Sequence, residues 1–244
     1  FDRWVWPNEN FDRHTYQKGA LVLHMLRDLV GDEAFFKTLR LFLTRHAFGS
    51  VTTEDFVATL GEATGQDLQW FFDQWVRRPG HPVLEVSQEW DQLCLTLRLR
   101  VRQVQDTSGR VPIFRARVRV GFETSYGRTS ELVWLGNKED SFDFKLPGRP
   151  LLVRFDEGDV LLAETTFRKS AQDLVYQIGH DDARGRAWAA GELSGLRNEP
   201  GVDAALLRAA REDGFWKVRE ASVAAIAASR RPEDVALFRD RAVE

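Results

Sequence analysis

Cysteine and methionine are almost absent from this 244-residue chain, which contains one of each. A single cysteine, Cys94, excludes an internal disulfide and is compatible with a reducing compartment. No apolar run approaches the roughly 20 residues that a membrane-spanning helix needs, and we expect a soluble chain without a membrane partner. The compartment stays unknown, with the cytoplasm favoured. An excess of positive charge is also missing, because 34 Lys and Arg stand against 37 Asp and Glu. The whole chain therefore has no general attraction for nucleic acid.

The motifs of a self-sufficient catalytic centre are missing as well. The five histidines are His14, His24, His46, His81 and His180. None lies three, four or five positions from another, so the sequence has neither His-Glu-x-x-His nor a zinc-finger pair. It also lacks the Gly-x-Ser-x-Gly turn of a serine nucleophile and the Gly-x-x-x-x-Gly-Lys-Ser/Thr loop that binds phosphate. We therefore expect no metal to bind this chain.

A starting methionine and a signal peptide are absent too, since the chain opens with Phe1-Asp2-Arg3-Trp4. We expect these residues to come from the middle of a longer polypeptide.

Residues 1–80 have the apolar spacing of helices and form the first expected domain. Apolar residues cover nearly every side of the segment 15–30, which predicts a helix buried inside something larger. The segment 33–46 repeats aromatic and aliphatic residues at helical spacing. Further on, Thr52-x-x-Asp55 predicts a capping box at the start of another helix.

The end of this domain is also marked in the sequence. Gly65 is expected to end the helix that begins after Thr52. Three aromatic residues at helical spacing (Phe71, Phe72 and Trp75) are interpreted as core. The breaker Arg78-Pro79-Gly80-His81-Pro82 then stops the helical pattern and sets the first boundary.

Residues 81–168 change to the alternation that is typical of strands. Apolar positions alternate with Cys94, Thr96 and arginines along 93–102, and the same period appears along 114–123, 142–146 and 151–155. Arginines at alternate positions are interpreted as the solvated face of each strand. One wet face and one dry face in several short strands predict an antiparallel β-sandwich.

Residues 169–244 return to a helical pattern. Arg186 and Arg219 are 33 positions apart and lie in similar Ala-rich surroundings. Two such helix pairs predict HEAT-like or armadillo-like repeats, and two copies indicate an incomplete array. The expected fold is thus a multidomain α+β chain of helices, then a sandwich, then a helical repeat domain.

One short stretch combines a tyrosine, a lysine and a glycine at the start of the first apolar helix: Tyr16-Gln17-Lys18-Gly19-Ala20. Taken alone, it indicates a buried helix whose tyrosine makes one hydrogen bond. The stretch is followed, in order, by Gly-Asp-Glu-Ala-Phe-Phe, Thr-Thr-Glu-Asp-Phe and Trp-Val-x-x-Pro-Gly-x-Pro-Val-Leu. Together this series, over about residues 10–86, resembles the C-terminal part of an M1-family (gluzincin) zinc aminopeptidase, after its zinc-binding helices.

The resemblance implies a function and a role for one residue. In that family a zinc ion held by His-Glu-x-x-His and a distant Glu activates the water that attacks the first peptide bond. Tyr16 is similar to the tyrosine that donates a hydrogen bond to the oxyanion of the tetrahedral intermediate, a role that suits a phenol that is protonated at neutral pH. The implied partners are peptide substrates and the missing N-terminal half of the same protein. The zinc belongs to the full-length family member, and the isolated chain is expected to be inactive.

Two other hypotheses stay open at this point. M1-like architecture could serve a non-catalytic scaffold or protein-interaction module, and an upstream His-Glu-x-x-His would separate the enzyme from the scaffold. A free-standing partner-binding protein would instead need Tyr16 to be packed away from solvent.

Overall fold

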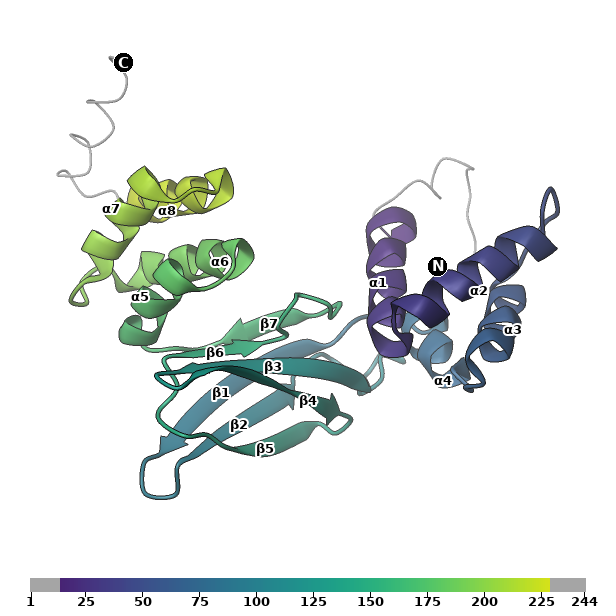
Figure 1. Ribbon diagram of the computed structural model, residues 1–244, viewed down its shortest axis with the longest axis horizontal. Helices are drawn as coiled ribbons and strands as arrows, with labels where there is room; N and C mark the ends of the chain where they lie inside the picture. The colour runs from purple at the N-terminus through teal and green to yellow at the C-terminus, as the bar shows by residue number, and fades with distance from the viewer. Residues whose placement is uncertain (1–13, 229–244) are drawn as a thin grey trace, which may run out of the picture.

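The computed structural model describes residues 14–228, and the first and last residues of the expected outer domains lie outside this range. Figure 1 shows a group of helices at one end, two sheets in the middle and a second group of helices at the other end. The elements follow one another along the chain in the same order. The expected order of helices, strands and helices is therefore confirmed within residues 14–228.

The first helical group packs around aliphatic and aromatic residues. Its members are the π-helix η2 (His14–Lys18), α1 (Gly19–Val30), α2 (Asp32–Arg45), α3 (Thr53–Thr64), α4 (Gln69–Phe72) and the π-helix η3 (Asp73–Arg77). Leu26 and Leu60 are completely buried, and the three predicted core aromatics are 1–4% exposed. The prediction for these aromatics is confirmed.

The limits of α3 follow directly from local chemistry. The Thr52 hydroxyl accepts a hydrogen bond from the backbone N–H of Asp55, whose carboxylate accepts one from the backbone N–H of Thr52. This is the predicted capping box, which satisfies two N–H groups at the helix start. At the other end Gly65 has a φ of 69°, the left-handed conformation that glycine adopts without steric cost. Both predictions are confirmed.

The middle of the chain forms two sheets. The strands are β1 (Val83–Asp91), β2 (Thr96–Gln103), β3 (Ala116–Thr124), β4 (Gly127–Leu135), β5 (Glu139–Lys145), β6 (Leu152–Phe155) and β7 (Glu164–Phe167). One sheet has the order β5-β2-β1-β7 and the other has the order β4-β3-β6. The two sheets contribute to one hydrophobic core, in which the rings of Phe122 on β3 and Phe144 on β5 have centroids 4.7 Å apart.

Two details of the strands differ from the predictions. The pairing is not wholly antiparallel, because β7 returns beside β1 in the parallel direction. The segment around Cys94 is a turn and not the polar side of a strand, and Cys94 is exposed. The reason is Asp91, whose carboxylate accepts hydrogen bonds from the backbone N–H groups of Leu93 and Cys94. Such side-chain bonds stabilise a turn in competition with the strand ladder.

The second helical group contains two helix pairs. Its helices are α5 (Ala171–His180), α6 (Ala183–Leu193), α7 (Val202–Glu212) and α8 (Trp216–Ala228). Arg186 on α6 forms a two-fold ion pair with Asp213, at 2.8 and 3.0 Å, and so joins the first pair to the second. Arg186 donates to the backbone carbonyl of Asp181, and Arg219 donates similarly to that of Asp213. The two arginines that the sequence pattern matched thus have similar local roles.

The second helical group is fixed to the sheets by buried charges. Arg154 on β6 donates to Asp181 at 2.6 Å and to Asp159 at 2.9 Å, with its side chain 10% exposed. Lys169, just before α5, donates to the backbone carbonyl of Val153 and to the side-chain oxygen of Gln177. Burial lowers the pKa of Lys169 to about 8, against the opposing effect of nearby carboxylates. This junction is therefore polar, tightly paired and sensitive to substitution.

None of the helices within residues 14–228 is both long enough and apolar enough to cross a bilayer.

Candidate functional site

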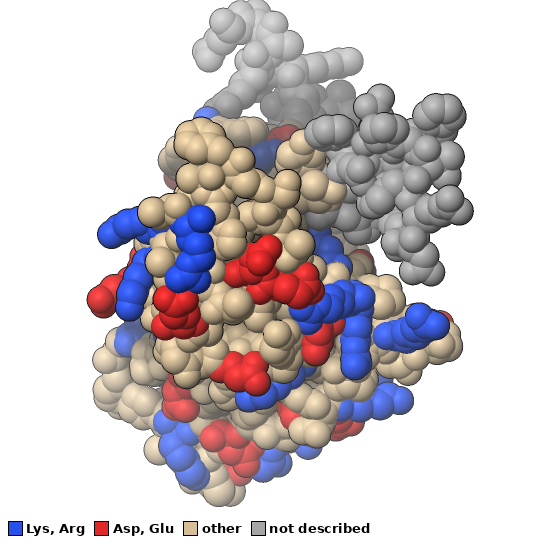
Figure 2. Space-filling model, turned by 90° about the vertical axis from the view of Figure 1, so that its right-hand side faces the viewer, with Lys and Arg blue, Asp and Glu red and all other residues tan. Residues whose placement is uncertain are grey.

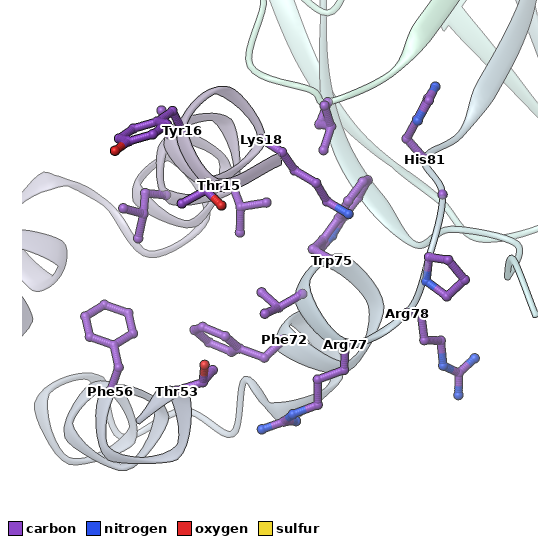
Figure 3. A pocket seen from close by; sticks show the side chains of 18 of the residues that line it. Thr15, Tyr16, Lys18, Thr53, Phe56, Phe72, Trp75, Arg77, Arg78 and His81 are labelled. Atoms are coloured by element: carbon purple, nitrogen blue, oxygen red, sulfur yellow. The ribbon is translucent and has the colours of Figure 1, made fainter. Parts of the chain in front are cut away.

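A cleft of about 1680 Å³ lies within the first helical group, beside the segment that leads into the sheets. Its walls come from η2 and α1 on one side, α3 and η3 on the other, and the chain segment 78–81. Figure 3 shows the η2 and α1 side chains facing those of α3 and η3 across this space.

Both π-helices of the first helical group contribute to this cleft. Thr15, Tyr16 and Lys18 come from η2, and Trp75, Val76 and Arg77 come from η3. A π-turn inserts an extra residue into a helix and changes the direction of its side chains, and it is found frequently at functional sites. Nothing in the residue pattern distinguishes these turns from ordinary α-helix, and they are therefore not predictable from the sequence.

Tyr16, the one residue predicted to be catalytic, lines the cleft and is 56% exposed. The ring lies on the η2 side in Figure 3. Two exposed aliphatic residues, Leu23 and Val51, line the same cleft. The tyrosine is therefore not sealed inside a core, as the free-standing hypothesis required.

Lys18, two residues further on, extends toward Trp75 on the opposite wall (Figure 3). Burial lowers the pKa of Lys18 below its usual value. Within residues 14–228 its ammonium group has no hydrogen-bond or ion-pair partner. The cleft thus contains a half-buried cation without a counter-ion from the described part of the chain.

The other cations near the cleft fall into two groups. Arg77 is neutralised by Asp73 and by Glu54, at 2.5 and 3.0 Å. His81 contacts Glu164 at 2.9 Å. Arg78 and Arg110 are exposed and have no side-chain partner among the described residues.

The two walls of the cleft are attached at the start of β3, to residues two positions apart. On the η3 side, Gln74 makes two hydrogen bonds with the backbone of Arg115, one from its amide and one to its carbonyl oxygen, at 2.8 and 2.7 Å. The Arg115 guanidinium also lies 4.6 Å from the ring centres of both Trp70 and Trp134. On the α1 side, Arg117 forms an ion pair with Asp28 at 2.9 Å. Arg115 is exposed, as the solvated-face interpretation expects, whereas Arg117 is partly buried, and both arginines also contact the helices.

A metal site is not apparent in the cleft or elsewhere among residues 14–228. No group of three or more His, Cys, Asp and Glu side chains is placed there to hold a metal ion. The residues that the structure describes therefore do not fit the zinc ion that the sequence resemblance implies.

The sequence comparisons concern the segment that builds the cleft. Residues 5–75 match the family described as the Peptidase family M1 domain. Aminopeptidase N of Lactococcus lactis subsp. lactis is 38% identical over 82 residues, which are 34% of this chain and 10% of that protein. Aminopeptidase N of Streptomyces lividans is 39% identical over 94 residues, or 38% of this chain and 11% of that protein.

Residues 5–75 of this chain are thus similar to the domain of peptidase family M1. The chain matches only about a tenth of the length of these two relatives.

The fold beyond the M1 segment also has a counterpart among solved structures. The crystal structure of Legionella pneumophila aminopeptidase A in complex with aspartic acid superimposes with a TM-score of 0.74. The match covers 89% of this chain and 27% of that one, at 22% identity. The helices and sheets that follow the M1 segment are thus arranged as in part of a known aminopeptidase structure.

Proposed function

We propose that this chain is the C-terminal portion of a zinc-dependent metallo-aminopeptidase that removes N-terminal residues from peptides. The observation that carries the proposal is the position of Tyr16 on the wall of an open cleft that the M1 segment forms. In the proposed protein the zinc ligands and the missing N-terminal half of the catalytic domain come from outside the described residues.

The role proposed for Tyr16 is to donate a hydrogen bond to the oxyanion of the tetrahedral intermediate. A phenolic O–H placed where negative charge develops donates a stronger hydrogen bond to the oxyanion of the transition state than to the neutral carbonyl of the substrate. It therefore stabilises the transition state more than the bound substrate. The chain contributes a hydrogen-bond donor and a peptide-sized cleft. The residues that would hold the zinc ion belong to the rest of the proposed protein.

The rest of the chain has a supporting role in this proposal. We propose that the two sheets form a β-sandwich domain and that α5–α8 begin a HEAT-like array, with domain limits at residues 80 and 168. The ion pairs of Arg154 hold these two parts together.

The test of Tyr16 is the Tyr16→Phe variant of the longer aminopeptidase. We expect kcat to fall about 100- to 1000-fold, the usual loss for one oxyanion donor, with little change in thermal stability. Tyr126→Phe is the matched control, because Tyr126 is 74% exposed on the β3–β4 turn and lies outside the cleft. Unchanged turnover in Tyr16→Phe would remove this residue from the mechanism and favour the non-catalytic scaffold.

The isolated 244-residue chain provides a second test. We expect it to have no zinc-dependent aminopeptidase activity, because a donor without an activated water does not hydrolyse a peptide. The assay is release of a chromogenic amine from an aminoacyl substrate, with and without added zinc. Zinc-dependent turnover by this chain would contradict the proposed division of roles.

A further inference from the structure

The helix that carries Tyr16 is attached to the rest of the described structure through its later turns. The π-helix η2 continues into α1 without a break, because the backbone of Lys18 between them is itself helical, with a φ of −63° and a ψ of −44°. Tyr16 is exposed, whereas the buried residues of α1 begin at Val22. The direction of the later turns is therefore transmitted along one continuous helix to the tyrosine.

One contact from the sheets fixes the last turn of α1. The Nη2 atom of Arg117 on β3 forms an ion pair with the Asp28 carboxylate at 2.9 Å and also donates to the backbone carbonyl of Asp28. That carbonyl is among the last four of α1, for which the helix itself has no N–H partner. β3 is the central strand of its sheet and pairs with β4 over its whole length. A single guanidinium thus joins the end of the helix to a firmly held strand by two bonds.

This ion pair differs from those on the surface of the first helical group. Figure 2 shows Lys, Arg, Asp and Glu side chains mixed over the end of the molecule that this group forms. The pair of Arg27 and Asp32 on the same group is well exposed, with side chains 41% and 69% accessible to solvent. Exposed pairs of this kind constrain geometry weakly, because water competes for each charge. The side chains of Arg117 and Asp28 are only 22% and 28% exposed, so water competes less for the bonds between them.

The remaining donor of Arg117 indicates that this contact serves geometry more than stability. Its Nε atom is buried and has no hydrogen-bond partner among residues 14–228. A buried N–H without an acceptor is unfavourable and offsets part of what the ion pair contributes to folding. The two bonds to Asp28 nevertheless form together in only one direction of α1 against β3. We therefore expect the loss of Arg117 to change the direction of the helix more than the stability of the fold.

The length of the helix amplifies a small change of direction. Tyr16 precedes Asp28 by 12 residues, which is about 18 Å along a helix. A tilt of about 5° at the last turn therefore moves the tyrosine by roughly 1.5 Å. Misplacing a reacting group by about 1 Å can lower turnover about 100-fold. The contact at Asp28 is thus able to affect an oxyanion donor that it does not touch.

We propose that Arg117 is a positioning residue for Tyr16. Its bonds to the carboxylate and the carbonyl of Asp28 set the direction of η2 and α1, and this direction aims the phenolic O–H. The inference rests on the proposed function, because the role of Tyr16 is taken from there. It adds the residue of β3 on which that role depends, and so makes the sheets part of the catalytic geometry.

The test is a double-mutant cycle in the longer aminopeptidase, made of Arg117→Gln, Tyr16→Phe and the variant with both substitutions. Arg117→Gln should lower kcat about tenfold and change KM less than about twofold, because a displaced donor weakens the binding of the transition state and not of the substrate. In the Tyr16→Phe protein the same substitution should change kcat less than about twofold, because no hydroxyl remains to be aimed. A merely structural role would give the same fold loss in both proteins.

Two more variants make the cycle specific. Arg119→Gln is the matched control and should keep the full kcat, because Arg119 lies two residues further along β3 and makes no side-chain hydrogen bond or ion pair with residues 14–228. Asp28→Asn keeps the shape of the side chain and the backbone carbonyl, so it should lower kcat only about two- to threefold. If Arg117→Gln does not fold, Asp28→Asn takes its place in the cycle.

Three results would overturn the positioning role. They are an unchanged kcat in Arg117→Gln, an equal fold loss with and without the Tyr16 hydroxyl, and a loss in Arg119→Gln as large as in Arg117→Gln. Each of them leaves the proposed function standing as long as Tyr16→Phe alone is slow. Unchanged turnover in Tyr16→Phe is the separate result that removes the proposed function, and this inference with it.

Discussion

Replacing Gly185 by alanine tests the buried junction between the sheets and the second helical group. Gly185 lies in the first turn of α6, where a Cβ atom would be 1.8 Å from the Asp181 carboxylate and 1.9 Å from the Arg154 guanidinium. Ordinary carbon contacts need about 3.5 Å, so the Arg154–Asp181 pair would have to separate from the helix by more than 1 Å. Both side chains are nearly buried, at 10% and 9% exposed.

Two opposing effects decide the magnitude. Alanine favours a helix over glycine by about 1 kcal/mol. Breaking a buried ion pair costs about 3–5 kcal/mol, because each partner is left without compensation. The second effect is larger, and Gly185→Ala should lower the free energy of unfolding by about 2–4 kcal/mol.

The assay is urea-induced unfolding followed by circular dichroism, together with hydrogen exchange of the segment 171–193. Gly191→Ala is the matched control in the same helix, since nothing lies within 4 Å of a Cβ at that position. The control should stabilise the protein by about 0.5–1 kcal/mol. If Gly185→Ala stabilises the protein as the control does, the close approach of Arg154 and Asp181 to α6 is not real and the reasoning fails.

Two further substitutions test neighbouring parts of the structure. Lys169, with its pKa lowered to about 8, is neutral in the folded state but charged in the unfolded state between about pH 8 and 10.5. The free energy of unfolding should therefore rise with pH through this window. In urea titrations the wild type should gain roughly 1–2 kcal/mol between pH 7 and 9.5 relative to Lys169→Met. If the difference between the two proteins does not depend on pH, the ammonium group is not buried. Gln74→Leu leaves the backbone N–H and C=O groups of Arg115 without their side-chain partner, so it should lower the free energy of unfolding by about 2–4 kcal/mol in the same titrations. Gln66→Leu is the control and should be nearly neutral, because Gln66 is exposed.

The parts of the fold that were predictable are those set by neighbours in the sequence. The capping box of Thr52 and Asp55, the helix end at Gly65 and the aromatic core around Trp75 all depend on spacings of a few residues. Helical and strand periods likewise assigned the three parts of the chain in the right order. Local spacing is the information that a single sequence contains most directly.

The errors come from contacts between distant residues. The side chains of Arg115 and Arg117 follow the alternation of an exposed strand face, yet they also contact Trp70 and Asp28 on distant helices. The turn at Cys94 is a local exception, because a side-chain bond from Asp91 replaces the strand ladder that the alternation of leucines predicted.

The candidate site was predictable in one residue only. Tyr16 was identified by its resemblance to a family motif, and the structure places it on the cleft. Arg78 and Arg110 were not identified from the sequence. Their place beside the cleft depends on the packing of Val111, in the loop of Arg110, against Gly80, more than twenty residues earlier in the chain. Charge neutralisation of Arg77 by Glu54 is equally invisible before the helices are assembled.

The attachment of both cleft walls at the start of β3 has a consequence for the mobility of the cleft. Arg115 and Arg117 are two positions apart, about 7 Å along an extended strand, and covalent geometry fixes that spacing. A movement that narrows or widens the opening must therefore break the Gln74 or the Asp28 contact, or bend the strand itself. The opening is accordingly formed in advance during folding, and a peptide bound as proposed would lose its own freedom without having to order the protein around it.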